Sequence, residues 1–123
     1  MKIRENYTCP LEIVHDITRG KWKTIIIFQM RNKSCSLSEL EHSIEGITQK
    51  MLLEQLNELK DFGMIGKIVF KGYPLHVEYF LTDMGGRVLQ AINILQDVGI
   101  EYMMQNGMGD ILKQKGLYPA KYR

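Results

Sequence analysis

The sequence predicts an α+β fold, mainly α, and the prediction rests on the stretch from Gly46 to Gly85. An amphipathic helical pattern ends there at Gly63, and two alternating segments follow, joined by the turn Gly72-Tyr73-Pro74. A helix followed at once by a small hairpin is the layout of a winged helix-turn-helix, which presents a helix of groove-fitting width beside a strand pair. We therefore expect a winged helix-turn-helix with a two-stranded wing and added N- and C-terminal dimerisation helices.

Length and composition fit one domain with a single core, since 45% of the 123 residues are hydrophobic. The formal net charge is +2, from 16 Lys and Arg against 14 Asp and Glu, too small to indicate nucleic acid by charge alone. No apolar run follows the early basic residues, and the longest one, Thr24 to Phe28, is too short for a membrane span. The 2 cysteines form no CxxC, so we expect a reducing, cytoplasmic setting without a membrane partner.

The first part of the chain predicts two helices. Pro10 suits the first position of a helix, so we expect one from Pro10 to Gly20, with Cys9 at or next to its N-cap. Lys21 to Arg31 is nearly apolar all round, which predicts a second helix at the buried centre of the domain. A polar turn, Asn32 to Cys35, follows it.

The next two helices are the expected helix-turn-helix. Ser36-Leu37-Ser38-Glu39 has the S-x-x-E form of a capping box and starts a short helix to about Ser43. Thr48 is a good N-cap for a helix that runs to about Phe62 and stops at Gly63. The buried face of that helix is predicted by leucines at i, i+4 and i+7, which are Leu52, Leu56 and Leu59.

The wing and the last helix complete the expected domain. In the strands Ile65 to Lys71 and Leu75 to Leu81, alternation places Val77, Tyr79 and Leu81 inward and His76, Glu78 and Phe80 outward. Thr82 caps a long helix from about Met84 to Gln105, whose apolar residues lie on more than one face. A single small domain cannot cover such a helix, so we expect a homodimer. The domain is expected over residues 9–105, with residues 106–123 as a C-terminal tail.

Polar residues on the exposed side of the helix 48–62 form the candidate DNA-reading set. Gln and Asn can pair bidentately with adenine, Lys can contact phosphate or guanine, and Leu can touch a thymine methyl. A carboxylate on this face counts against DNA binding unless it accepts from a cytosine amino group, and such a face is also typical of an ordinary solvated helix. Basic wing residues are phosphate candidates, although lysines also protect exposed sheet edges. The candidate DNA-binding residues are Ser36, Thr48, Gln49, Lys50, Leu53, Glu54, Asn57, Lys67, Lys71 and His76.

Cys9 is the candidate redox residue. A helix N-terminus lowers the pKa of a thiol there, and the nearby Lys2 and Arg4 would favour the thiolate further. The alternative is a structural cysteine that behaves as a small hydrophobe. Cys35 is either the resolving partner of Cys9 or an incidental loop thiol.

The histidines lie too far apart for metal ligation, so we expect no metal and no cofactor. The apolar seam of a dimer could admit a small hydrophobic effector, which is the one small-molecule partner that we consider.

A series of short motifs runs along most of the chain, from Cys9 to about Tyr102. They are Cys9-Pro10, Gly20-Lys21-Trp22, Ser38 to Leu40, Gly46 to Leu52, Leu56, Glu58-Leu59, Gly63, Pro74, Val77-Glu78-Tyr79, Leu81-Thr82 and Gly85. In this order and spacing the chain resembles the HxlR-type family of winged-helix transcriptional regulators. The resemblance implies a homodimer that binds an inverted repeat near a promoter, and it places Cys9 where some members sense oxidants or electrophiles.

The chain departs from the family where arginines are usual, at Ser36-Leu37, at Asn57 and at Gly66-Lys67. These departures, with the near-neutral charge, favour a competing function, a winged-helix protein-interaction module without sequence-specific DNA binding, for which Phe80 would be an anchor. A thiol enzyme using Cys9 would need an ordered Cys-His-acid arrangement that the sequence lacks, so the chain is not expected to be an enzyme.

Overall fold

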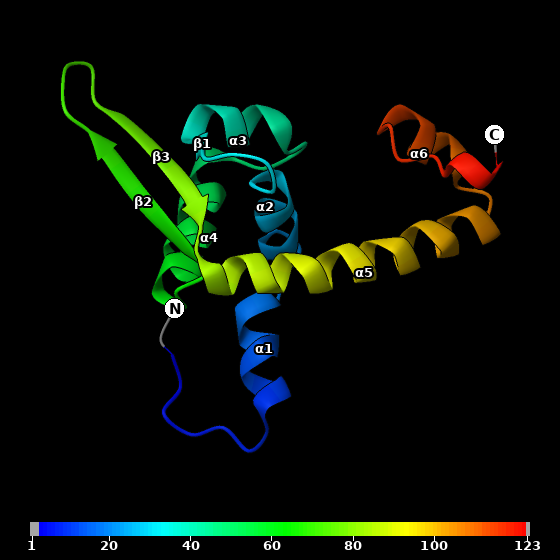
Figure 1. Cartoon of the computed structure of the whole chain (residues 1–123), viewed down its shortest axis with the longest axis horizontal. Helices are drawn as coiled ribbons and strands as arrows, with labels where there is room; N and C mark the ends of the chain where they lie inside the picture. Colours follow the sequence, from blue (N-terminus) through cyan, green and yellow to red (C-terminus); the bar gives the residue numbers. More distant parts are fainter. Residues whose placement is uncertain (1–2, 123) are drawn as a thin grey trace. The chain divides into compact units, whose positions relative to one another are not determined.

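The computed structural model describes residues 3–122, and its order of helices and strands can be followed along the chain in Figure 1. The chain forms two compact units, one ending at Leu89 and one beginning at Gln90, so that the boundary falls inside the longest helix. The elements are α1 (Pro10–Thr18), α2 (Lys23–Gln29), β1 (Cys35–Ser36), α3 (Leu37–Ser43), α4 (Gln49–Asp61), β2 (Ile65–Phe70), β3 (His76–Leu81), α5 (Asp83–Gln105), α6 (Gly109–Gln114) and a 3-10 turn, Ala120–Tyr122.

The expected starts of α3, α4 and α5 are confirmed, whereas α2 begins at Lys23, two residues after its expected start at Lys21. At α3, the Ser36 hydroxyl accepts the Glu39 N–H and the Glu39 carboxylate accepts the Ser36 N–H, both at 3.1 Å, which completes the capping box. At α4, the Thr48 hydroxyl accepts the Met51 N–H at 3.1 Å. At α5, Thr82 caps in the same way. The polar residues therefore start each of these helices where the sequence pattern places them.

The sheet has three strands, whereas the sequence predicted two. β1 pairs antiparallel with β3, and the strand order is β1-β3-β2. The placement of Cys35 in a polar turn was wrong, because Cys35 pairs with Tyr79 and is only 5% exposed. A two-residue strand is too short to leave an alternation pattern, so only its partner in β3 defines it.

The hairpin follows the expected alternation only in part, because Val77 and Leu81, expected inward, are half-buried and most of β2 is exposed. Tyr79 is buried and His76 is exposed, but Glu78 and Phe80 are half-buried although the pattern placed them outward. The Phe80 ring covers Gly66 on β2, where an added Cβ would lie 2.3 Å from the ring. The missing side chain of Gly66 therefore lets Phe80 fold onto the sheet.

The core of the first unit holds α4 in place. The three α4 leucines predicted to be buried are at most 1% exposed, and aliphatic residues of α2, α3 and β2 are buried with them. Burial of each such side chain stabilises the fold by about 1.5–3 kcal/mol. The core residues that are at most 2% exposed in this unit are Ile26, Ile27, Leu40, Leu52, Leu56, Leu59, Met64 and Ile65.

The second unit contains the rest of α5, then α6 and the 3-10 turn. Gly107 takes a φ of +75° and the Met108 N–H bonds to the Met103 carbonyl at 2.9 Å, which ends α5 in the manner of a Schellman motif. Leu112 of α6 is buried, so the tail has ordered structure that the sequence pattern did not reveal. Among the described residues, no helix is long and apolar enough to span a bilayer.

Candidate nucleic-acid interface

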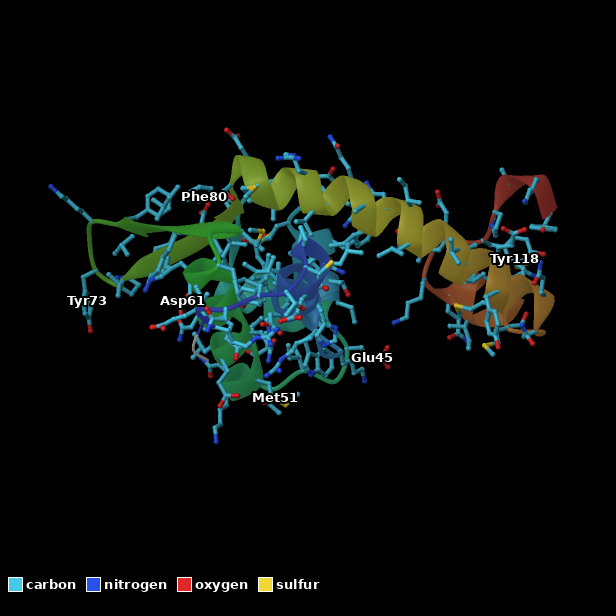
Figure 2. The ribbon with its side chains drawn as sticks, turned by 90° about the horizontal axis from the view of Figure 1, so that it is seen from below. Glu45, Met51, Asp61, Tyr73, Phe80 and Tyr118 are labelled. Carbon is cyan, nitrogen blue, oxygen red and sulfur yellow. The ribbon has the colours of Figure 1, made fainter. Side chains whose placement is uncertain are left out.

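Helix α4 presents the predicted polar face outward. Gln49, Lys50, Glu54 and Asn57 are exposed and Leu53 is 37% exposed, while the leucine face is buried. Met51 and Asp61 mark the two ends of this helix in Figure 2. A helix with its side chains is about 10–12 Å across and the major groove is about 12 Å wide, so α4 can enter it.

The turn before α4 completes the helix-turn-helix. Ile44 is the C-cap of α3, and Gly46 takes a φ of +86° that a glycine adopts without strain. The side chain of Ser36 lies at the other end of α3 and is occupied by the capping box. Ser36 therefore has a structural role in addition to its candidate role in DNA binding, and the same holds for Thr48 at α4.

The wing carries basic and apolar residues together. Lys67 and Lys71 are exposed, as a phosphate contact requires. Tyr73 is fully exposed at the tip of the hairpin, where Figure 2 shows it pointing away from the strands, and Phe70 and Leu75 are exposed nearby. This apolar tip was not singled out from the sequence.

A small network ties the wing to the segment before α3. The Ser34 hydroxyl donates to Glu78 Oε1 at 2.5 Å, and His76 Nε2 lies 2.8 Å from Glu78 Oε2. These two hydrogen bonds lower the pKa of the Glu78 carboxyl, and the bond from Ser34 has the larger effect on it. The His76 ring also lies 5.3 Å from the Phe70 ring. His76 is therefore held by a carboxylate that competes with any phosphate for it.

Cys9 is exposed at the N-cap of α1, and its side chain makes no capping hydrogen bond. Arg4, expected to favour its thiolate, pairs with two α1 carboxylates, Asp16 at 2.9 Å and Glu12 at 3.0 Å. Hydrogen bonds from the Tyr7 hydroxyl and from Arg4 lower the pKa of Asp16. The charge of Arg4 is thus offset by acids, while Lys2 lies outside the described residues.

Cys35 is not a loop thiol. Its Sγ lies 3.7 Å from the Gln29 carbonyl and 3.6 Å from the Lys33 carbonyl, and burial raises the pKa of the thiol. A buried thiol with a raised pKa is a poor nucleophile, so the structure disfavours Cys35 as a resolving partner.

Lys23 was missed by the sequence reasoning, which treated α2 as nearly apolar all round. Its side chain is 2% exposed, and its ammonium donates to Gln55 and Glu58 on α4. The sequence feature that could have indicated a buried lysine is its position directly before the apolar run of α2, Thr24 to Phe28. Among residues 3–122 no group of three His, Cys, Asp or Glu side chains could hold a metal ion.

A capped helix after a short helix and turn, followed by a hairpin, defines the chain as a winged helix-turn-helix protein of the DNA-binding class. The family model of the HxlR-like helix-turn-helix matches residues 17–107. The chain therefore belongs to the HxlR-like helix-turn-helix family and is a DNA-binding transcriptional regulator, and members of this family are not enzymes.

Individual relatives agree with this assignment. An uncharacterised helix-turn-helix transcriptional regulator of Methanothermobacter thermautotrophicus is 33% identical over 98 residues, which cover 80% of this chain and 75% of that protein. A Porphyromonas gingivalis W83 structure assigned to the MarR family of regulators is 35% identical, with a TM-score of 0.73, covering 81% of this chain and 98% of its own. The reduced form of the redox regulator HypR is 33% identical, with a TM-score of 0.67, and the match covers 86% of this chain and 99% of the HypR chain.

Proposed function

We propose that this regulator binds an inverted-repeat operator as a homodimer, with α4 of each subunit in the major groove and the β2–β3 hairpin beside it. The observation that carries the proposal is the exposed row of Gln49, Lys50, Leu53 and Asn57 on a helix whose opposite face is held by buried leucines. Side chains that read bases must be held by a rigid element, and α4 supplies one.

The second half of α5 supports the homodimer. In the unit that begins at Gln90, four large apolar residues of this helix are each at least 61% exposed: Ile94, Leu95, Val98 and Tyr102. An exposed apolar stripe of this kind is typical of an interface between subunits. Two subunits related by a two-fold axis would place two copies of α4 on half-sites about 34–36 Å apart.

Cys9 supports a redox- or electrophile-responsive regulator. HypR, a protein of similar sequence and fold, is described as a redox regulator and has been solved in reduced and oxidised forms. Cys9 is the exposed one of the two thiols and lies at the start of α1. Oxidation of Cys9 would change the entry of the chain into α1 and thereby the spacing of the two copies of α4 in the dimer. The alternative signal is a small apolar effector that binds in the dimer seam.

Selection of duplexes from a random pool tests the proposal. We expect enrichment of an inverted repeat, and an affinity for it that falls steeply as the salt concentration rises, because phosphate contacts release counterions. A scrambled duplex of the same length is the control. If no sequence is enriched, the protein-interaction module replaces the sequence-specific regulator.

A further inference from the structure

A buried lysine joins α2 to the helix that is proposed to read DNA. Lys23 is the first residue of α2, and its ammonium donates to Gln55 Oε1 at 2.9 Å and to Glu58 Oε2 at 2.5 Å. The two acceptors are three residues apart on α4, so they are neighbours on one flank of that helix. This flank lies between the buried leucines and the exposed row, and one cation therefore holds two successive turns of α4.

Helix electrostatics do not explain this pair. A cation is unfavourable at a helix N-terminus, where Lys23 lies, and an anion is unfavourable in a last turn, where Glu58 lies. Burial also removes the hydration of the Lys23 ammonium. Since well-packed apolar side chains would often be at least as stable in such a place, the pair points to a role other than stability.

We propose that Lys23 is a positioning residue, which fixes the rotation of α4 about its own axis and thereby decides which of its side chains reach base edges. The inference rests on the proposed function, sequence-specific DNA binding through α4. The buried leucines hold α4 against the core through non-directional contacts, whereas hydrogen bonds add a directional constraint that holds donor and acceptor within about 2.7–3.2 Å. A rotation of about 10° moves the outer atoms of a helix about 10–12 Å wide by about 1 Å. That displacement is enough to break a hydrogen bond to a base.

Two variants separate positioning from stability. Lys23→Met with Glu58→Leu removes both charges and leaves the net charge unchanged. We expect this double variant to keep the urea midpoint of the wild type or exceed it, and to keep its affinity for a scrambled duplex. Its affinity ratio for selected over scrambled duplex should fall by about tenfold or more, the discrimination of one bidentate base contact.

Glu58→Gln should behave in the opposite way. It keeps an acceptor for the Lys23 ammonium, so that α4 stays in place and the affinity ratio is retained, but it leaves a buried cation without a counter-charge and lowers the urea midpoint. A residue with a purely structural role would not produce this reversal. Lys60→Met with Asp61→Asn, two exposed positions of the same helix, is the charge-matched control and should preserve both quantities.

The possible results are distinct. If the wild type enriches no sequence, the proposed function fails. If the wild type enriches an operator and the Lys23→Met, Glu58→Leu variant keeps the wild-type ratio, DNA reading stands and the role of Lys23 is overturned. If that variant does not fold, the pair serves stability and the inference is likewise overturned.

Discussion

Two adjacent glycines at the start of α5 occupy different environments. A Cβ on Gly85 would lie 2.0 Å from the carbonyl oxygen of Met64, the same oxygen that accepts the Thr82 N–H at 3.1 Å. A Cβ on Gly86 would meet no atom within 4 Å. Only the first glycine is therefore required by the close approach of two backbone segments.

We predict that Gly85→Ala lowers the free energy of unfolding by about 1–3 kcal/mol, because the backbone must move to admit the methyl group. Gly86→Ala should instead raise it by about 0.5–1 kcal/mol, since alanine loses less conformational freedom than glycine in a helix. Urea unfolding at a fixed protein concentration measures both values. Equal effects of the two substitutions would contradict the difference in packing.

We predict that Cys9 and Cys35 differ strongly in reactivity. In Cys35→Ser, the remaining Cys9 is exposed and should be alkylated by iodoacetamide rapidly. In Cys9→Ser, the remaining Cys35 is buried and its pKa is raised, so alkylation should be slow until urea unfolds the protein. Mild oxidation should change DNA binding in Cys35→Ser and leave it unchanged in Cys9→Ser. Equal sensitivity of the two variants would remove Cys9 from the redox proposal.

At the scale of single elements, the start of α3 is stabilised by a carboxylate. The Lys33 ammonium lies 2.7 Å from Glu39 Oε2, and the Ser36 N–H donates to the other oxygen at 3.1 Å. These two interactions lower the pKa of the Glu39 carboxyl to about 2, and the hydrogen bond from Lys33 has the larger effect. The ionised form of Glu39 therefore belongs to the folded state of this helix.

The free energy of unfolding should depend on pH through the ionisation of the Glu39 carboxyl. Because its folded pKa lies below the ordinary value of 4.5, its contribution is fully present above pH 4.5 and is lost as the pH falls towards about 2. Glu39→Gln should be less stable than the wild type at neutral pH, and the difference should shrink over that window. Lys33→Met should reduce the same pH dependence in part. Urea midpoints between pH 2.5 and 7, chosen to span this window, test the prediction, and a constant difference between Glu39→Gln and wild type would refute it.

A second prediction at this scale concerns α4, the helix that is proposed to read DNA. Gln49→Ala and Asn57→Ala should each weaken binding to the selected operator by about 1–3 kcal/mol and affect the scrambled duplex little, since their amides can pair with adenine. Lys50→Ala should weaken both duplexes alike and reduce the salt slope by about 1, as loss of a phosphate contact does. Binding titrations at several salt concentrations distinguish the two patterns. Wild-type selectivity in the Gln49 and Asn57 variants would mean that other residues read the bases.

At the scale of the whole molecule, we expect subunit association to depend on the exposed stripe of α5. Leu95→Glu introduces a charge into that stripe and should give a monomer by light scattering at micromolar concentration. Its affinity for an inverted repeat should fall to that for a single half-site. Asn93→Glu adds the same charge to an exposed position about opposite Leu95 on the helix and should leave the dimer intact. A monomeric wild type would contradict the homodimer itself.

Periodicity and capping residues determined most of the local structure from the sequence alone. The capping box at Ser36, the cap at Thr48, the leucine face of α4 and the two strands of the wing all depend on neighbours within a few residues, which a sequence pattern records. The exposure of the polar row on α4 followed from the same periodicity.

Only the tertiary structure decided the features that join distant segments. Cys35 became a buried strand residue because β3 pairs with it, and Lys23 became a buried cation because Gln55 and Glu58 of α4 surround its ammonium. In the same way, Glu78 is half-buried and its carboxylate accepts a hydrogen bond from the Ser34 hydroxyl. Periodicity assigns a residue to a face of its own element, whereas the partner across the fold decides whether a polar group on that face can be buried, since burial requires a hydrogen bond or a counter-charge.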